Sequence, residues 1–125
     1  MKKFVNNVEN ILTESLSGFG KAHPDIIKVN FAPDFISRLQ KAKNPKVALI
    51  SGGGSGHEPL HGGFVGVGML DAACPGQVFS APTPDQIEAA ANEVHNEKGI
   101  LFIVKNYSGD IMNFEMGADM INHEH

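Results

Sequence analysis

VALISGGGSG, residues 47–56, joins a continuous apolar run to a cluster of glycines. Such a run is typical of a strand that is buried on both faces of a sheet. Ile100-Leu101-Phe102-Ile103-Val104 forms a second apolar run, and Ala72-Ala73-Cys74 indicates a third, shorter strand. Helical patterns lie between and after these strands. Strands that alternate with helices predict an α/β fold with a parallel, or mostly parallel, sheet and flanking helices.

The clearest helix start is Thr83-Pro84-Asp85-Gln86. Thr83 suits the N-cap, Pro84 suits the first helical position, and Gln86 completes a capping box. This predicts a helix that ends near Gly99. Its buried stripe consists of Ile87, Ala90, Ala91 and Val94.

The remaining segments are predicted from apolar spacing. One helical face contains Val5, Val8, Leu12, Leu16 and Phe19, with Gly20 and Pro24 as the stop, and a last one contains Ile111, Phe114, Ala118 and Ile121. Residues 105–110 form a polar loop before that last helix. Residues 26–29 are predicted as a short strand and residues 33–39 as a short helix.

Composition restricts the class of protein. The chain has 125 residues, of which 42% are hydrophobic and 19% charged, as in a single soluble globular domain. A net charge of -4 with no basic run argues against nucleic-acid binding. No apolar segment approaches the roughly 20 residues that cross a bilayer. The single cysteine, Cys74, fits a cytoplasmic location and a small core residue.

His57-Glu58-Pro59-Leu60-His61 has the formal pattern H-E-x-x-H of a zinc protease helix. That motif requires both histidines on one face of a regular helix. Pro59 fits only a first helical turn, and the glycines that follow disfavour a long helix. No third ligand stands at an obvious position. We therefore expect no metal site, and we interpret His61 as a histidine in a loop or a pocket wall.

The glycine cluster matches neither phosphate-binding motif. The P-loop needs Lys followed by Ser or Thr, and the dinucleotide fingerprint would need a glycine where His57 stands. Backbone N–H groups in a glycine-rich loop nevertheless approach a ligand closely. Residues 52–56 are therefore interpreted as a ligand-contacting loop rather than as a simple turn.

Two loops are expected to meet at the same edge of the sheet. Both apolar strands end in polar residues, and ligands of open α/β sheets bind at the carboxyl ends of the strands. His57, Lys105 and Asp110 then converge on one crevice, where they suit a small ligand with hydroxyl and carbonyl groups. Two alternatives stay open: Asp110 as the N-cap of the last helix, and Lys105 as a solvated strand end.

These motifs together resemble the DhaK-type dihydroxyacetone kinases. The resemblance is carried by residues 46–59 (KVALISGGGSGHEP), 73–76 (ACPG), 82–85 (PTPD), 104–110 (VKNYSGD) and 113–115 (NFE). It implies that the chain, residues 1–125, is the N-terminal α/β part of a dihydroxyacetone-binding domain and a fragment of a longer chain. The implied function is to bind dihydroxyacetone and to position it for phosphorylation.

The resemblance also implies roles for residues. Gly53 and Gly54 line the substrate pocket, and Lys105 lies beside it. His57 and Asp110 contact the substrate hydroxyls and act as the catalytic acid or base, with Asp110 as the base for the attacking hydroxyl.

The implied partners follow the same family. A DhaL-type subunit carries ADP or ATP and Mg²⁺, so this chain is expected to bind no cofactor. A DhaM-type subunit of the phosphotransferase system relays phosphate from phosphoenolpyruvate, although some members use ATP directly. The full-length protein is expected to be a homodimer.

Two departures from the family pattern matter. The family binds the ketone covalently through a histidine that lies beyond residue 125, so this chain alone is expected to be inactive. Ala81 stands where the family pattern Phe-x-Ser-Pro-Thr has serine, and Ser80 is the nearby substitute. The alternative function is a non-catalytic, DhaK-like sensor of dihydroxyacetone that activates a transcription regulator.

Overall fold

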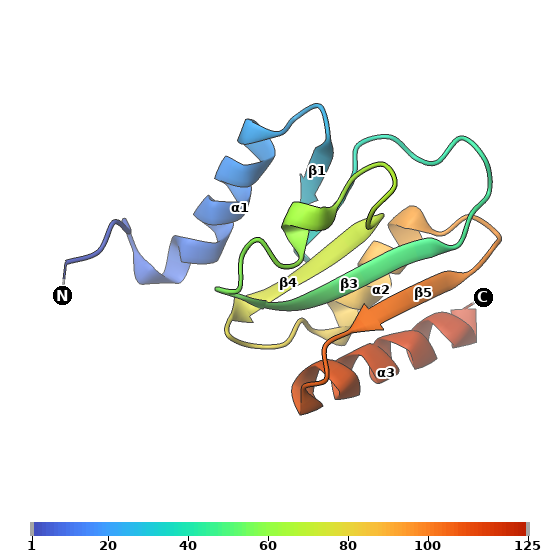
Figure 1. Cartoon of the computed structure of the whole chain (residues 1–125). Helices are drawn as coiled ribbons and strands as arrows, with labels where there is room; N and C mark the ends of the chain where they lie inside the picture. The colour runs from blue at the N-terminus through green and yellow to red at the C-terminus, as the bar shows by residue number, and fades with distance from the viewer. Residues whose placement is uncertain (1, 125) are drawn as a thin grey trace.

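The computed structural model describes residues 2–124, and the side chains of residues 2–122. Five strands form one sheet in the order β1-β2-β4-β3-β5 (Figure 1). The strands are β1 Ile27–Asn30, β2 Phe35–Arg38, β3 Ala48–Ser55, β4 Ala72–Val78 and β5 Ile100–Val104. The helices are α1 Ile11–Ala22, α2 Pro84–Val94 and α3 Ser108–Glu124, with short 3-10 turns at Val8–Asn10 and Gly62–Phe64.

The centre of the sheet is parallel and one side of it is antiparallel. Strand β3 lies between β4 and β5 and runs parallel to both, as Figure 1 shows. Strands β1 and β2 add on beyond β4 in antiparallel pairs. The predicted α/β fold with a mostly parallel sheet is therefore confirmed.

The prediction of a helix over residues 33–39 is wrong. Residues 35–38 form β2, which pairs with β1 and with β4. Phe35, Ile36 and Ser37 are all buried, because β2 lies inside the sheet with neighbours on both sides. Pairing with strands close by and far along the chain therefore outweighed the local helical spacing.

Two apolar cores lie on opposite faces of the sheet. The alternation of side chains along β4 sends Ala72 and Cys74 to one face and Ala73 to the other. The first face packs against α2 and α3, through residues such as Ile87 and Phe114. The second packs against α1, through Leu12 and Leu16.

Helix α1 is shorter than the predicted apolar face. Leu12 and Leu16 are buried, but Val5 and Val8 precede the helix and are exposed. The prediction that these two valines belong to the buried face is therefore wrong. The glycine and proline signals for the stop agree with an end at Ala22.

The start of α2 is as the sequence predicts. The Gln86 N–H donates to the Thr83 hydroxyl, and the Gln86 side chain accepts from the Thr83 N–H at 2.9 Å. The Gln86 amide also donates to the carbonyl oxygens of Asp34 and Pro75, at 2.8 and 2.7 Å. The helix ends at Val94, earlier than the predicted end near Gly99.

Strand β5 is an edge strand. It pairs with β3 alone within the described residues, and its side chains alternate between half-buried and exposed. Leu101 and Ile103 are exposed, at 53% and 50%. An apolar strand is therefore confirmed here, and only one of its faces is packed.

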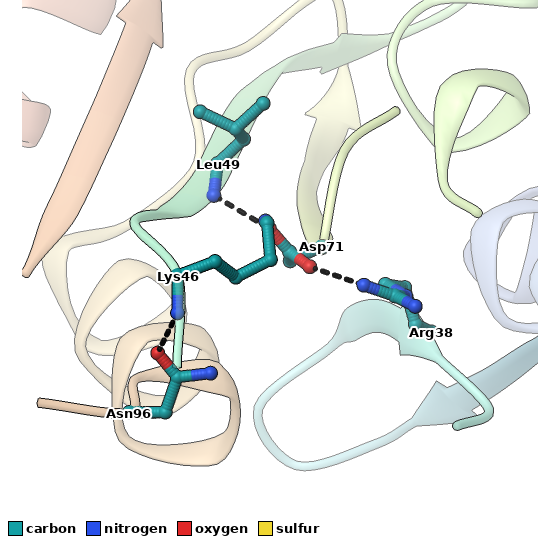
Figure 2. A network of polar contacts seen from close by, with 5 residues as sticks. All are labelled: Arg38, Lys46, Leu49, Asp71 and Asn96. Carbon is teal, nitrogen blue, oxygen red and sulfur yellow. Dashed lines mark hydrogen bonds and ion pairs between the residues drawn. The ribbon is translucent and has the colours of Figure 1, made fainter. Parts of the chain in front are cut away.

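The buried carboxylate of Asp71 links the ends of neighbouring strands of the sheet. Asp71 lies directly before β4 and forms ion pairs with Arg38, at 3.0 Å, and with Lys46, while the backbone N–H of Leu49 donates to it at 2.7 Å (Figure 2). The backbone N–H of Lys46 in turn donates to the Asn96 side chain, so the loop after α2 joins the network. Burial raises the pKa of Asp71, but hydrogen bonds from Lys46, Leu49 and Arg38 outweigh burial and hold the pKa below its ordinary value of 3.8.

Candidate functional site

The glycines after Ser51 belong to strand β3 rather than to a loop. Gly52 and Gly54 face the same side of the sheet, where space is short. A Cβ at Gly52 would stand 2.6 Å from the Cys74 carbonyl oxygen, and one at Gly54 would stand 2.5 Å from the Ser80 nitrogen. The predicted loop is therefore wrong in its backbone: these glycines let the strand continue where neighbouring backbone approaches closely.

The structure brings His57, Lys105 and Asp110 to one cavity. This cavity has a volume of about 530 Å³ and lies at the carboxyl ends of the parallel strands. Its wall consists of Gly54, His57, Phe79, Ser80, Ala81, Lys105, Tyr107, Gly109, Asp110 and Asn113. Gly53, one residue earlier on β3, is not in this wall and instead lines a second cavity together with His61.

Asp110 supplies the buried carboxylate of the cavity. It lies in the first turn of α3, which begins at Ser108, so its interpretation as an N-cap is wrong. The predicted polar loop is correspondingly shorter than residues 105–110. Asp110 is only 6% exposed, and its Oδ1 atom is buried with no hydrogen-bond partner among the described residues. A buried acceptor that lacks a donor favours a ligand that brings one.

Lys105 and His57 lie at the mouth of the cavity. Lys105 follows β5 directly and is half-buried, with its ammonium group 5.5 Å from the centre of the Tyr107 ring. His57 follows the turn at Gly56, and its ring packs edge-on against Phe79 with centres 5.1 Å apart. Each of these side chains therefore has an aromatic neighbour beside the cavity.

Phe79 and Ser80 are wall residues that the motif analysis did not select as site residues. Phe79 has a φ of +53°, a left-handed conformation that is unusual for a bulky residue. Its backbone passes close to Gly54 and its ring close to Gly56. Ser80 and Ala81 both line the cavity, so a hydroxyl remains available beside the alanine.

His61 lies on the other side of β3. Its Nδ1 atom is 2.9 Å from the Ser51 hydroxyl oxygen, and its Nε2 atom is buried with no partner among the described residues. Burial, followed by the positive charge of Lys105, lowers the pKa of His61 from 6.5, although Asp110 opposes the shift. The charge of Lys105 therefore acts on His61 as well as on the first cavity.

His61 lines a second cavity, of about 400 Å³, between α1 and β3. The wall is mostly apolar and includes Leu16, Phe19, Ile36, Pro59 and Leu60, and Gly54 lines both cavities. The interpretation of His61 as a pocket-wall histidine is confirmed, for this second cavity.

The zinc interpretation has no structural support in the described part of the chain. His57 and His61 lie in turns before the 3-10 turn at Gly62–Phe64 and not on a regular helix. Among the described side chains, those of residues 2–122, no group of three or more His, Cys, Asp and Glu is placed to hold a metal ion. The same residues include no helix long and apolar enough to cross a membrane.

Comparison with known proteins gives a consistent family. The Dak1 domain matches residues 17–125. The dihydroxyacetone-binding subunit DhaK of the PEP-dependent dihydroxyacetone kinase of Escherichia coli is 48% identical over 122 residues, which cover 98% of this chain and 34% of that protein. The corresponding PTS-dependent subunit of Lactococcus lactis is also 48% identical, over 98% of this chain and 37% of that protein. The chain thus spans about a third of the length of these relatives.

Solved structures share the fold. The dihydroxyacetone kinase from C. freundii, in complex with AMP-PNP and Mg²⁺, superposes with a TM-score of 0.90 at 39% identity, over 98% of this chain and 23% of that chain. The dihydroxyacetone kinase operon co-activator Dha-DhaQ superposes with a TM-score of 0.81 at 34% identity, over 89% of this chain and 34% of that chain.

Proposed function

This chain belongs to the Dak1 domain family, and on that premise we propose that it binds dihydroxyacetone in the cavity between His57, Lys105 and Asp110. The observation that carries the proposal is the buried Oδ1 atom of Asp110, which has no hydrogen-bond partner among the described residues and belongs to a residue in the wall of a cavity that also offers a cation and an imidazole. Dihydroxyacetone brings two hydroxyl donors and one carbonyl acceptor. Asp110 then accepts from a hydroxyl, and Lys105 donates to the carbonyl oxygen.

The bound ketone is positioned for phosphorylation on a terminal hydroxyl. Asp110 takes the hydroxyl proton as the oxygen forms its bond to phosphorus and the donor's leaving oxygen departs. His57 holds the hydroxyl in line and shares the acid-base role. Gly53 and Gly54 keep this part of the sheet free of side chains, so that the ligand approaches the backbone.

The phosphoryl donor is proposed to sit on another subunit. A DhaL-type partner supplies ADP or ATP with Mg²⁺, and a DhaM-type carrier supplies phosphate to it. The names of the relatives, PEP-dependent and PTS-dependent, support this arrangement. The rest of the relatives' length supplies the covalent histidine and, in the homodimer, contacts between copies. The proposed location is the cytoplasm.

A second candidate function is a dihydroxyacetone sensor that activates a transcription regulator. It is favoured by the structural similarity to the co-activator Dha-DhaQ and by Ala81 in the cavity wall. Both candidates require the same ligand, and they differ in turnover. The kinase is the better supported of the two, because several DhaK subunits resemble the chain closely.

Titration of the isotope-labelled chain with dihydroxyacetone tests the binding. We expect amide shifts centred on Gly54, Lys105 and Asp110, and weaker shifts with glycerol, which has no carbonyl group. Asp110→Leu is the matched control, because it removes the acceptor and fills a similar volume. Shifts that survive in that variant would place the ligand elsewhere.

Turnover separates the two candidates. The protein completed to the length of its relatives is mixed with a DhaL-type subunit, a phosphoryl donor and dihydroxyacetone. Formation of dihydroxyacetone phosphate supports the kinase. Binding without any phosphorylation overturns it and leaves the sensor.

A further inference from the structure

His61 lies just outside the proposed substrate cavity but next to one of its wall residues. Its position is fixed at one end by Ser51, whose hydroxyl oxygen lies 2.9 Å from Nδ1. The other ring nitrogen, Nε2, is buried and unpaired within the described residues. A buried polar atom without a partner calls for an explanation.

The Ser51 hydroxyl decides which nitrogen of His61 carries the proton. That hydroxyl donates its only hydrogen to the carbonyl oxygen of Ile103, at 2.7 Å. Its oxygen therefore acts as the acceptor for His61, and Nδ1 carries the hydrogen. In the neutral imidazole Nε2 is then a lone-pair acceptor. Burial and the nearby charge of Lys105, which both lower the pKa of His61, favour this neutral form.

Lys105 and His61 both lie beside Gly53. The point where a Cβ of Gly53 would stand lies 3.0 Å from Nε2 and 3.5 Å from the Lys105 Cδ atom. The side chains of His61 and Lys105 therefore both lie on the face of β3 towards which a side chain at residue 53 would point. Because residue 53 is glycine, no side chain separates them there. In this structure the Lys105 ammonium group, two bonds beyond Cδ, lies over the Tyr107 ring, 5.5 Å from its centre.

We propose that His61 is a positioning residue for Lys105: its Nε2 lone pair accepts a hydrogen bond from the ammonium group and holds Lys105 against Gly53 at the substrate cavity. Lys105 turns from Tyr107 to His61 when the ligand is bound. The ammonium group keeps two further hydrogens, one of which is available to the ligand carbonyl. This inference rests on the proposed function, because it assigns His61 a role only through a ligand-binding lysine.

His57 and Asp110 are the other titratable groups whose charges act on His61. Asp110 lies on α3, and His57 lies on the turn after β3. A protonated, charged His61 would repel Lys105, and its Nε2 atom would no longer be a hydrogen-bond acceptor. The arrangement therefore requires the neutral ring with its hydrogen on Nδ1: Ser51 fixes the position of the hydrogen, and burial together with the charge of Lys105 favours the neutral ring.

The first test reads the tautomer in the chain without ligand. Nitrogen NMR of labelled histidine distinguishes a protonated Nδ1 from a protonated Nε2. We expect the hydrogen on Nδ1, and Ser51→Ala is expected to release this preference. A hydrogen on Nε2 in the wild-type chain overturns the inference and leaves the proposed function standing.

The second test is a double-mutant cycle on dihydroxyacetone affinity. His61→Phe keeps the ring volume without the acceptor, and Lys105→Met keeps the stem without the charge. We expect His61→Phe to weaken binding about tenfold in the wild-type background and by less than about twofold when Lys105 is already Met. Equal losses in both backgrounds overturn the inference, because His61 would then act independently of Lys105.

A conservative variant guards against simple misfolding. His61→Gln places an uncharged amide oxygen near the position of Nε2, and we expect it to recover most of the affinity that His61→Phe loses. Failure of Gln to recover affinity, with unfolding transitions matching those of the wild type, also counts against the inference. If the wild-type chain does not bind dihydroxyacetone, the proposed function is overturned. The tautomer measurement does not depend on that binding, so the two failures are distinguishable.

Discussion

Arg38 and Asp71, which are 33 residues apart in the sequence, form an ion pair of 3.0 Å whose side chains are 11% and 8% exposed. The pair joins the end of β2 to the start of β4 (Figure 2). Lys46 and the backbone of Leu49 add two more donors to the same carboxylate. Three segments of the chain, the end of β2, the start of β3 and the start of β4, are therefore joined through one carboxylate, at the end of the sheet opposite to the proposed substrate cavity.

Asp71 makes the stability of the fold depend on pH in the acid range. Its folded pKa lies below 3.8, so the unfolded chain takes up the proton first as the pH falls. The contribution is fully present above about pH 4 and is lost as the pH falls towards the folded value. We expect Asp71→Asn to lower the free energy of unfolding by about 3 kcal/mol at pH 7 and to flatten the acid dependence below pH 4. Urea denaturation at several pH values measures both.

Asp25→Asn is the matched control for that experiment. Asp25 is exposed in the turn after α1 and is expected to change the free energy of unfolding by less than about 0.5 kcal/mol. An acid dependence that persists unchanged in Asp71→Asn would mean that other carboxylates govern it.

Asp110→Asn tests the proposed catalytic base. The amide keeps the size of the side chain and fills the same buried position, but it does not take a proton from the substrate. In the completed kinase with its DhaL-type partner, we expect turnover to fall by about a hundredfold or more while dihydroxyacetone affinity changes only a few-fold. Steady-state kinetics and titration measure the two effects. Turnover near the wild-type rate would reduce Asp110 to an orienting role.

Gly54→Ala tests the close approach of β3 to the turn at Ser80. The new methyl group would stand 2.5 Å from a backbone nitrogen, so the turn that forms part of the cavity wall must move. We expect the free energy of unfolding to fall by about 2 kcal/mol and ligand affinity to fall with it.

Gly18→Ala is the matched control, and its effect on the free energy of unfolding is expected to have the opposite sign. Gly18 lies inside α1, is exposed, and has no atom within 4 Å of the position of a Cβ. The free energy of unfolding of this variant is expected to rise by about 0.5–1 kcal/mol, because alanine favours the helix. A loss at both glycines would show that backbone conformation, and not contact, sets the effect at Gly54.

Cys74 is expected to be unreactive in the folded chain. It is fully buried, and burial raises the pKa of its thiol to about 12. At pH 8 the thiolate is therefore scarce and a reagent has no access to it. Labelling with a disulfide reagent should be slow in buffer and fast in urea. Rapid labelling without urea would mean that the packing of β4 against α2 opens readily.

Removal of metal ions is expected to leave the fold unchanged. His57 and His61 point to different cavities, and His61 is already bonded to Ser51. Chelation should therefore not shift the thermal unfolding transition. One zinc ion per chain that is lost in His57→Ala would contradict the site described above.

The strands and helices that the sequence predicted carried their own local signals. The apolar runs marked β3 and β5, and Thr83 with Gln86 marked the start of α2 because their bonds are local. Residues 33–39 carried no such signal, since β2 exists through pairing with β1 and β4. The glycines of β3 were interpreted as a loop for a related reason: what they make room for is backbone from residues 74 and 80, which only the fold brings close.

The candidate site also contains a part that the sequence predicts and a part that only the fold reveals. The convergence of His57, Lys105 and Asp110 followed from the rule that parallel strands end at one edge of the sheet. The state of His61 depends on the hydrogen bonds of Ser51 with His61 and Ile103 and on the charge of Lys105, and these residues lie on different strands and loops. No spacing in the sequence indicates which nitrogen of that ring is protonated.

Strand β5 has no neighbour on its outer side among residues 2–124, and this has a practical consequence for work with the chain. A strand with unpaired backbone groups and with Leu101 and Ile103 half-exposed is a template on which another copy can add its own edge. Association of this kind depends on concentration and is strongest where net repulsion is weakest, near the isoelectric point of about 5.8. Dilute samples well above that pH will therefore aggregate least.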